Sequence, residues 1–449
     1  MNRPKRIISL IFHDAGRQFG FTGAPGAITP SVDQMASEGV SFASHFSTGT
    51  VCIPSRASLL TGKYLHSAEI AHLVHDENTL PRLMSRAGYK TKRVGFAEEK
   101  EYRSIAGRRY SEDFDLSGKE LLGYDESDTA SSAASYVADQ IIDTLKNRPD
   151  ESLFIHGAFT EAHGPYNLPV TDEEVENTVL PPFLPKLPQV KEAKDYVARI
   201  NKAVTQGDQA IGRILDYLRE TGLDKDTLVY LTCDHGMDLP AAKQSCYDAG
   251  TGTVMLFWGN GLTPGVLTGL SSHVDIPATL CDLLDIPTPP DMRGESRLAA
   301  LLGREDPGRD YVFAEVSYDN TDAPVRSIRT KTHKYIQNFN PGLPVATANG
   351  FSAQVGYELL TKIYNTPRPA VELYDLEKDP YEQNNVAGQK EYEVVQNELR
   401  AELFRLMAKD NDEILRPGSV YENPDEQFAI ALWYKKEDGT FELRDPKSL

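Results

Sequence analysis

Cysteine is scarce in this 449-residue chain, and a surplus of positive charge is absent. The four cysteines, Cys52, Cys233, Cys246 and Cys281, are too few and too scattered for a disulfide framework, and no Cys-x-x-Cys pair marks a structural zinc site. The 47 Lys and Arg residues are outnumbered by 66 Asp and Glu residues, which gives a net charge of −19. We therefore expect no nucleic-acid partner, because phosphate contacts require clustered cations. A local basic pocket for a small anionic substrate is still compatible with this charge.

Long hydrophobic runs are also missing. No apolar stretch approaches the roughly 18 residues that a membrane-spanning helix requires, so we expect no membrane partner. The first apolar run, residues 7–12, follows basic residues but ends at His13-Asp14, without a small-residue cleavage site, and we interpret it as a buried strand. As the sequence stands we expect a cytoplasmic protein, or a periplasmic or secreted one if a leader was removed.

Short apolar runs alternate with helical patterns along most of the chain, which is typical of an α/β fold with a mostly parallel sheet. The predicted strands are residues 7–12, 91–94, 153–159, 227–232 and 254–258, and the predicted helices are residues 31–38, 80–86 and 196–221. Beyond about residue 320 the pattern changes to antiparallel strands within residues 325–336, a helix over 391–407 and a strand over 428–434. We therefore predict a large α/β domain, residues 1–322, whose mostly parallel mixed sheet is sandwiched by helices. A smaller α+β domain with an antiparallel sheet is predicted for residues 323–449.

The most informative segment is residues 52–62, which reads Cys-Ile-Pro-Ser-Arg-Ala-Ser-Leu-Leu-Thr-Gly. Pro54 suits the first position of a helix and Gly62 suits its end, which places Cys52 just before the helix N-terminus. Unpaired N–H groups there favour anions, and Arg56 can hold two oxygens of a tetrahedral anion. The simpler interpretation is a buried cysteine beside a helix start. Four fixed residue types within so few positions make that interpretation the weaker one.

Two further segments place metal ligands after predicted strands. Asp14 follows the strand at residues 7–12, and Asp234-His235 follows the strand at residues 227–232. Ligands gather at the carboxyl ends of strands in open α/β sheets, and hard divalent cations prefer carboxylates while tolerating an imidazole. An Asp after a strand is more often a turn or cap residue, but two of them together with Cys52 predict a metal site.

The Cys-x-Pro-Ser-Arg motif followed by Ala-Ser-Leu-Leu-Thr-Gly resembles the signature of type I sulfatases, in the alkaline-phosphatase-like superfamily. The resemblance implies that a formylglycine-generating enzyme oxidises Cys52 to formylglycine, an aldehyde that hydrates to a geminal diol. One diol oxygen attacks sulfur, and the other later collapses to the aldehyde and expels sulfate. The resemblance also implies one divalent cation, with Ca²⁺ expected, held by Asp14, Asp234, His235 and the modified Cys52.

Other positions match the family less specifically. His163 follows the strand at residues 153–159, where a histidine can protonate the leaving group. Lys243 has the spacing of a basic residue that reaches the sulfate, and His66 matches a pocket histidine. Tyr247, in a Tyr-x-x-Gly-Thr pattern, resembles the N-sulfoglucosamine sulfohydrolase branch, which favours a small N-sulfated sugar as substrate. The resemblance thus implies the catalytic residues Cys52, Arg56, His163 and Lys243 and the substrate-binding residues His66, Lys243 and Tyr247.

The chain also departs from the family pattern. His13 stands where a second acid is common, which leaves its role open between metal ligand and packing. Phe96 and Glu98 stand where a Gly-Lys-x-His motif supplies two cations, and Lys92, Arg93 and Lys100 are the nearby residues that could replace them. We therefore keep three alternatives to a sulfamidase: an O-sulfatase acting on aryl or carbohydrate sulfate, a phosphonate or phosphate ester hydrolase, and an inactive binding homologue. The sequence does not determine the oligomeric state, and a homodimer is one of the states that it allows.

Overall fold

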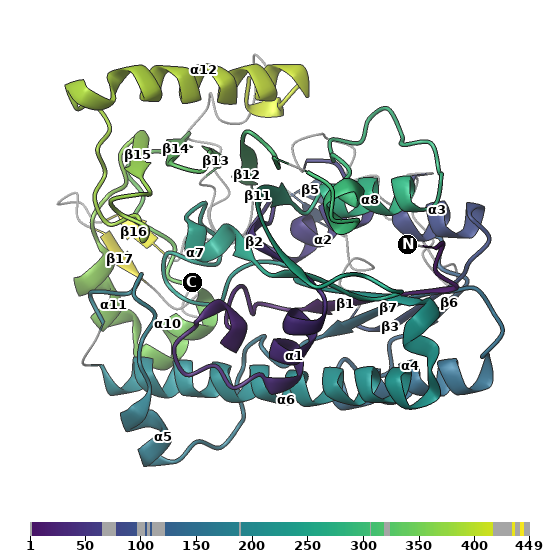
Figure 1. The fold of residues 1–449 in the computed structure, drawn as a ribbon. Coiled ribbons are helices and arrows are strands. Elements are labelled where there is room, and N and C mark those ends of the chain that lie inside the picture. The colour runs from purple at the N-terminus through teal and green to yellow at the C-terminus, as the bar shows by residue number, and fades with distance from the viewer. Residues whose placement is uncertain are drawn as a thin grey trace.

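A nine-stranded sheet, sheet A, forms the centre of the protein (Figure 1). The computed structural model describes residues 2–64, 78–96, 104–105, 108–109, 122–187, 190–305, 307–317, 324–415, 433–435 and 441–443. The strand order is β11-β2-β10-β8-β1-β7-β3-β6, with β9 paired to β2. Its strands are β1 (Arg6–Phe12), β2 (Val40–Phe46), β3 (Lys90–Gly95), β6 (Glu126–Asp128), β7 (Leu153–Phe159), β8 (Thr227–Cys233), β9 (Gly252–Thr253), β10 (Met255–Gly259) and β11 (Gly265–Ser272).

The three central strands are parallel and fully buried. Strand β1 pairs with β7 on one side and β8 on the other, so that Phe12 lies opposite Phe159 and Cys233. Every residue of these strands is buried, which explains why the sequence shows continuous apolar runs and not alternation. Because the register is even, the carboxyl ends of all three strands meet at the same edge of sheet A.

Helices cover both faces of sheet A (Figure 1). One layer contains α1 (Pro30–Glu38), α4 (Ala134–Asn147) and α6 (Lys191–Thr221), and the other contains α2 (Cys52–Thr61), α3 (Leu80–Arg86) and α8 (Asp275–Leu283). Ile8 and Leu10 of β1 pack in the first layer's core, and Ile7 and Ile11 pack in the second. The predicted mostly parallel mixed sheet between helices is therefore confirmed. Shorter helices are α5 (Asp172–Asn177), α7 (Asp248–Thr251), α9 (Leu298–Leu301), α10 (Asn349–Val355) and α11 (Tyr357–Tyr364).

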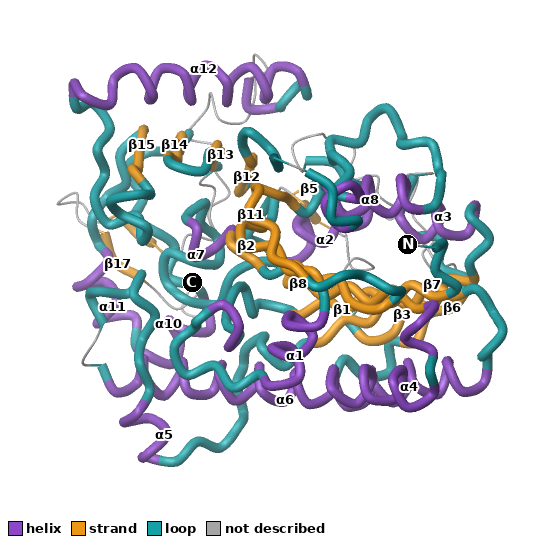
Figure 2. The backbone as a smooth tube through the Cα atoms, in the orientation of Figure 1, coloured by secondary structure: helices purple, strands orange, loops and turns teal. Residues whose placement is uncertain are grey.

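A second sheet, sheet B, confirms the predicted antiparallel part of the fold. Its strands, in order, are β12 (Val312–Val316), β13 (Val325–Arg329), β14 (His333–Asn338) and β15 (Val371–Asp375). Helix α12 (Glu393–Lys409) lies over sheet B (Figure 2) and buries Leu403 against Ile328 and Tyr335. Strand β12 precedes residue 323, so sheet B includes a strand from the region assigned to the first domain, and the domain division stays a prediction. Two-stranded sheets join β4 (Ser104–Ile105) to β5 (Arg108–Arg109) and β16 (Trp433–Lys435) to β17 (Phe441–Leu443).

The predicted start of helix α2 differs from the structure. Helix α2 begins at Cys52 itself, and Pro54 is its third residue, so Cys52 lies in the first turn instead of before it. Residues 428–432 of the last predicted strand lie outside the described residues, and its remaining residues, 433 and 434, belong to β16. Within the described part of the chain, no helix combines the length and the apolar character needed to cross a membrane.

Candidate active site

The carboxyl ends of β1 and β8 and the first turn of α2 bring the predicted metal ligands together. Asp14 follows β1, Asp234 and His235 follow β8, and Cys52 opens α2. Ligand atoms of His13, Asp14, Cys52 and Asp234, all buried, lie within 4.8 Å of one another. His235 Nε2 lies 3.3 Å from both Asp14 Oδ1 and Cys52 Sγ. We refer to these five residues as the Asp14 cluster.

The backbone and Lys243 fix how the two carboxylates are turned. Asp14 has φ 52°, a left-handed conformation that is uncommon for residues other than glycine. The backbone N–H groups of Asp14 and His235 donate to Asp234 Oδ1 at 2.9 and 2.8 Å. Lys243 Nζ donates to Asp14 Oδ2 at 2.7 Å. Each carboxylate therefore has one oxygen held by the protein, and its other oxygen, Asp14 Oδ1 or Asp234 Oδ2, faces the cluster.

Cys52 lies inside this group of charges. Its Sγ is 3.3 Å from His235 Nε2 and 3.7 Å from both His13 Nδ1 and Asp14 Oδ1. Burial raises the pKa of the Cys52 thiol, but the positive charges of His13 and Lys243 outweigh burial and lower that pKa to about 5. The position therefore stabilises negative charge, which is what a nucleophile at this point requires.

Opposite charges compensate one another within the Asp14 cluster. Burial raises the pKa of Asp234, yet the positive charges of His13 and His235 lower it to about 2. Burial lowers the pKa of His235, yet Asp234 and Asp14 raise it to about 9. The pKa of Asp14 lies well below its usual value, because the charges of Lys243 and His13 outweigh burial. Both carboxylates are thus held ionised, the form that binds a metal ion.

Arg56 and Phe96 form the neighbouring wall. Arg56 is buried, its Nε lies 3.4 Å from Asp234 Oδ2, and its guanidinium carbon lies 4.8 Å from the centre of the Phe96 ring. The Phe96 ring also meets the His13 ring edge to face, with centroids 4.7 Å apart. Phe96, at one of the two positions where cations were expected, therefore packs between Arg56 and His13.

His163 lies at the exposed side of the cluster, after β7. Its ring centroid is 4.5 Å from that of His13, and its Nδ1 donates to Gly164 O at 2.6 Å. Partial burial lowers the pKa of His163, but a hydrogen bond with Cys52 and the charge of Asp14 raise it above the usual value. The structure thus brings the exposed imidazole of His163 beside Cys52, and its role as the general acid stays a prediction.

A model of the sulfatase family matches residues 6–286, which is more than half of the chain. The chain belongs to the sulfatase family. As a member of this family, it is a hydrolase of sulfate esters, and its alkaline-phosphatase-like α/β fold agrees with that membership.

Individual relatives of this sulfatase are distant but cover nearly all of it. An ulvan-active sulfatase from Formosa agariphila is 25% identical over 93% of this chain and 77% of its own length. The N-sulphoglucosamine sulphohydrolase of Homo sapiens is 24% identical over 94% of this chain and 93% of its own length. The solved structure of a phosphonate monoester hydrolase of Agrobacterium radiobacter superposes with a TM-score of 0.67 at 18% identity, covering 99% of this chain and 100% of that one. The last similarity shows a common fold.

The donor set of this sulfatase fits a divalent cation. Asp234 Oδ2 is buried and accepts no hydrogen bond from any residue that the structure describes. His235 Nδ1 donates to Gly236 O at 2.9 Å, which directs Nε2 toward Asp14 and Cys52, and a metal ion there would replace the Nε2 proton. Carboxylate oxygens and an imidazole nitrogen that converge in this way are a metal-binding arrangement, and the identity of the ion stays a prediction.

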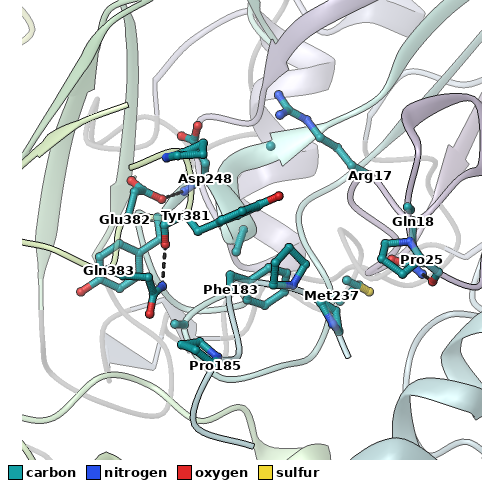
Figure 3. A pocket seen from close by; sticks show the side chains of 18 of the residues that line it. Arg17, Gln18, Pro25, Phe183, Pro185, Met237, Asp248, Tyr381, Glu382 and Gln383 are labelled. Atoms are coloured by element: carbon teal, nitrogen blue, oxygen red, sulfur yellow. Dashed lines mark hydrogen bonds between the residues drawn. The ribbon is translucent and has the colours of Figure 1, made fainter. Parts of the chain in front are cut away.

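Tyr247 lies away from the Asp14 cluster in this sulfatase. Its hydroxyl donates to Glu372 in β15 at 2.7 Å. Tyr247 lines a cavity of about 440 Å³, which we call the Tyr381 pocket. The other residues that line it are Arg17, Gln18, residues 22–25, Pro181, Pro182, Phe183, Pro185, Lys186, Met237, Ala241, Asp248, Ala249, Gly252, Val345, Tyr364 and residues 380–383. Figure 3 shows Asp248 and Glu382 on one side of this pocket and Phe183 and Pro185 below them in the view. Cys52, Arg56, His163 and Lys243 do not line it, so the predicted contact of Tyr247 with substrate stays a prediction.

The expected replacements for the missing cations do not reach the cluster through any described contact. Lys92 Nζ donates to Thr144 Oγ1 at 2.9 Å, and Arg93 donates to Ser127 Oγ and packs over the ring of Tyr124. His66, Glu98 and Lys100 lie outside the described residues.

One supporting contact of this sulfatase has no local sequence signal. Ser55 Oγ donates to the carbonyl of Asp234 and lies 3.2 Å from His273 Nδ1. Ser55 belongs to the Cys-x-Pro-Ser-Arg motif, but nothing in the sequence links that motif to His273. The contact ties the first turns of α2 to the loop that carries Asp234.

Proposed function

We propose that this sulfatase hydrolyses the sulfamate of a small N-sulfated sugar through a formylglycine made from Cys52. The observation that carries the proposal is the position of Cys52, in the first turn of α2 with its Sγ 3.3 Å from His235 Nε2 and 3.7 Å from Asp14 Oδ1. Hydrated formylglycine at this position supplies an oxygen nucleophile, and a divalent cation supplies positive charge that polarises the sulfate. A formylglycine-generating enzyme is therefore a required partner.

Residues of the chain hold and orient the sulfate group in this proposal. Arg56 is buried beside Cys52, and its guanidinium can fork two sulfate oxygens. Lys243 Nζ lies 2.7 Å from Asp14 Oδ2, so it keeps Asp14 ionised and stands near enough to Cys52 to neutralise a third oxygen. Negative charge that develops in the transition state is thus met by fixed cations.

His163 provides the proton that distinguishes a sulfamate from a sulfate ester. An amine leaving group must be protonated as the S–N bond breaks, whereas a phenolate leaves without help. The exposed ring of His163, packed on His13 and hydrogen-bonded to Gly164, is positioned for that transfer. The similarity to an N-sulphoglucosamine sulphohydrolase supports the same substrate class, with O-sulfate esters of sugars or phenols as the alternative.

A phosphonate ester hydrolase is the second candidate function. Phe96 stands in the wall of the site where the family pattern has a cationic side chain. A phosphonate monoester carries one negative charge, as a sulfate ester does, so the remaining cations could bind either group. The fold similarity to a phosphonate monoester hydrolase agrees with this alternative. An inactive binding homologue is the third possibility and predicts no turnover of either class.

The test combines the modification with turnover. Protein co-produced with a formylglycine-generating enzyme is digested, and the Cys52 peptide is examined by mass spectrometry for a hydrazide-reactive aldehyde. Release of sulfate from N-sulfoglucosamine and from an aryl sulfate is measured beside hydrolysis of an aryl phosphonate. We expect the aldehyde, and we expect Cys52→Ala to abolish turnover without unfolding the protein. Cys281→Ala, a change at another buried cysteine, is the matched control and keeps activity. A Cys52 that stays a thiol in fully active protein would refute the mechanism.

A further inference from the structure

The residue before Asp14 is a buried imidazole that faces the same point as the metal ligands. His13 is 0% exposed, and its Nδ1 lies 2.9 Å from Asp14 Oδ1 and 3.4 Å from Asp234 Oδ2. The same nitrogen lies 3.7 Å from Cys52 Sγ. The sequence left open whether this histidine binds a metal or only packs beneath it.

These separations match the distances between neighbouring ligand atoms around a metal ion. Two neighbouring ligands of a six-coordinate ion with bonds of about 2.1 Å lie about 3 Å apart, and longer sulfur bonds widen that edge. The His13–Asp14 separation of 2.9 Å, which is also a hydrogen bond, and the His13–Asp234 separation of 3.4 Å fall at this spacing. His13 also belongs, with Asp14, Cys52 and Asp234, to the group of buried ligand atoms that lie within 4.8 Å of one another.

The remaining contacts direct the ligand atoms to one point, where a metal ion would replace the Nδ1 proton that His13 shares with Asp14. Asp234 Oδ1 accepts two backbone N–H groups, and Asp234 Oδ2 is buried without a hydrogen bond from any described residue. Asp14 Oδ2 is held by Lys243, so Asp14 Oδ1 faces His13 Nδ1. His235 Nδ1 donates to Gly236 O, which directs Nε2 to the same point.

The rings of Phe96 and His163 hold the His13 imidazole in this orientation. Both meet it edge to face, with centroids 4.7 and 4.5 Å away. A ring fixed between two others is pre-organised to present one nitrogen, and the nitrogen it presents here is Nδ1.

We propose that His13 is a direct metal ligand through Nδ1 and that, together with His235, it makes this centre selective for a first-row transition ion such as Mn²⁺ or Zn²⁺ over Ca²⁺. Calcium takes oxygen ligands, whereas imidazole nitrogens favour transition ions. Two imidazoles beside two carboxylates therefore shift the preference away from the Ca²⁺ that the family resemblance implies. The proposal rests on the proposed function only in that the ion would serve that reaction.

Metal content tests the proposal without any turnover assay. Metal-stripped protein is dialysed against equal concentrations of Mn²⁺, Zn²⁺ and Ca²⁺, and the bound ions are counted by mass spectrometry. We expect the wild type to retain a transition ion and to exclude Ca²⁺. His13→Ala should weaken Mn²⁺ binding by about 10-fold or more. His13→Asp should restore a bound ion and raise the ratio of Ca²⁺ to Mn²⁺ by about 10-fold. His45→Gln, a change at a buried histidine outside the Asp14 cluster, should change neither value.

A spectroscopic readout on the wild type does not depend on how the variants fold. Pulsed electron paramagnetic resonance of Mn²⁺-loaded wild type should show modulation from two imidazole nitrogens, and His13→Asp should show one. Wild-type protein that prefers Ca²⁺, or that shows one nitrogen only, would overturn the proposal. Wild-type protein that shows the expected metal preference but releases no sulfate would count against the proposed function and leave the metal assignment in place.

Discussion

Two clusters of charged residues, one fully buried and one partly buried, use charge differently. The Asp14 cluster is the first. The second, which we call the Asp248 cluster, consists of Asp248, Arg329, Lys334 and Glu382. In the Asp248 cluster, Lys334 Nζ lies 2.7 Å from Asp248 Oδ1 and 3.0 Å from Glu382 Oε1, and Arg329 Nε lies 3.0 Å from Asp248 Oδ2. Each oxygen of Asp248 therefore faces a side-chain cation.

The Asp14 cluster is paired at longer distances. Asp234 Oδ2 is buried and accepts no hydrogen bond from any residue within the described ranges, although His13 Nδ1 and Arg56 Nε each lie 3.4 Å away. A buried carboxylate oxygen without a hydrogen bond is costly unless a ligand completes it. The comparison indicates that the Asp248 cluster joins α7 to sheet B, whereas the Asp14 cluster is arranged around a ligand.

The sharpest test of this comparison is Asp234→Asn. Losing the ligand charge should reduce kcat by about 1,000-fold, because about 4 kcal/mol of transition-state stabilisation depends on the metal and its ligands. Bound metal, measured by mass spectrometry, should fall in parallel. Asp208→Asn is the matched control, because Asp208 is equally buried but accepts hydrogen bonds from Ser31 and Val32 at the start of α1. Full metal content in Asp234→Asn would show that Asp234 Oδ2 serves no ligand.

The opposite result is expected for Asp248→Asn. Removing this charge leaves the buried Lys334 and the half-buried Arg329 with less compensation, which should lower the free energy of unfolding by about 3 kcal/mol. Metal content should stay at the wild-type level, because Asp248 contacts none of the Asp14 cluster. Urea denaturation and metal analysis of the same preparation provide both values. Glu358→Gln, which breaks the exposed ion pair with Lys362, is the control and should leave stability unchanged. A stable Asp248→Asn protein that lost its metal would reverse the roles of the two clusters.

His163→Ala tests the exposed side of the Asp14 cluster. We expect kcat/KM for a sulfamate to fall about 100-fold, while kcat/KM for an aryl sulfate falls only a few-fold, because only the amine leaving group requires a proton. The measurement is the pair of kcat/KM values for wild type and variant. His333→Ala changes a half-buried histidine of β14 and should affect neither substrate. Equal losses on both substrates would remove His163 from the role of acid.

Much of the Asp14 cluster is predictable from the sequence because its parts are local. The apolar runs at β1 and β8 identify buried parallel strands, and parallel strands bring Asp14 and Asp234 to one edge. Pro54 and Gly62, which suit the start and the end of a helix, identify α2, although not the exact residue at which it begins. The first turn of α6 escaped prediction, because residues 191–195 are mostly charged and carry little apolar periodicity.

The remaining contacts depend on tertiary neighbours. The packing of Phe96 between Arg56 and His13 requires β3 to end beside α2, which no local pattern specifies. The direction of Tyr247 is a further case, because spacing from Asp234 places its backbone but not its side chain, which turns to Glu372. The Asp248 cluster joins residues more than 80 positions apart and left no motif that could reveal it.

Glu382 provides the smallest and most specific test of the Asp248 cluster. Burial raises the pKa of Glu382 from its ordinary value of 4.5 to about 7, although Lys334 opposes that rise. Between these two pH values the folded protein holds a proton that the unfolded chain has released, so the free energy of unfolding falls as pH rises from about 4.5 to about 7.

In Glu382→Gln this proton is absent, and the pH-dependent contribution disappears. The variant should therefore gain stability relative to the wild type as pH rises through that window, by at most about 1.4 kcal/mol per pH unit. Urea denaturation of both proteins at pH 5, 6, 7 and 8 measures the difference. Parallel curves would mean that Lys334 keeps Glu382 ionised throughout, and the Asp248 cluster would then be paired at both carboxylates. Diverging curves would mean that Lys334 is shared unequally, with Asp248 as its main partner, as the shorter 2.7 Å contact indicates.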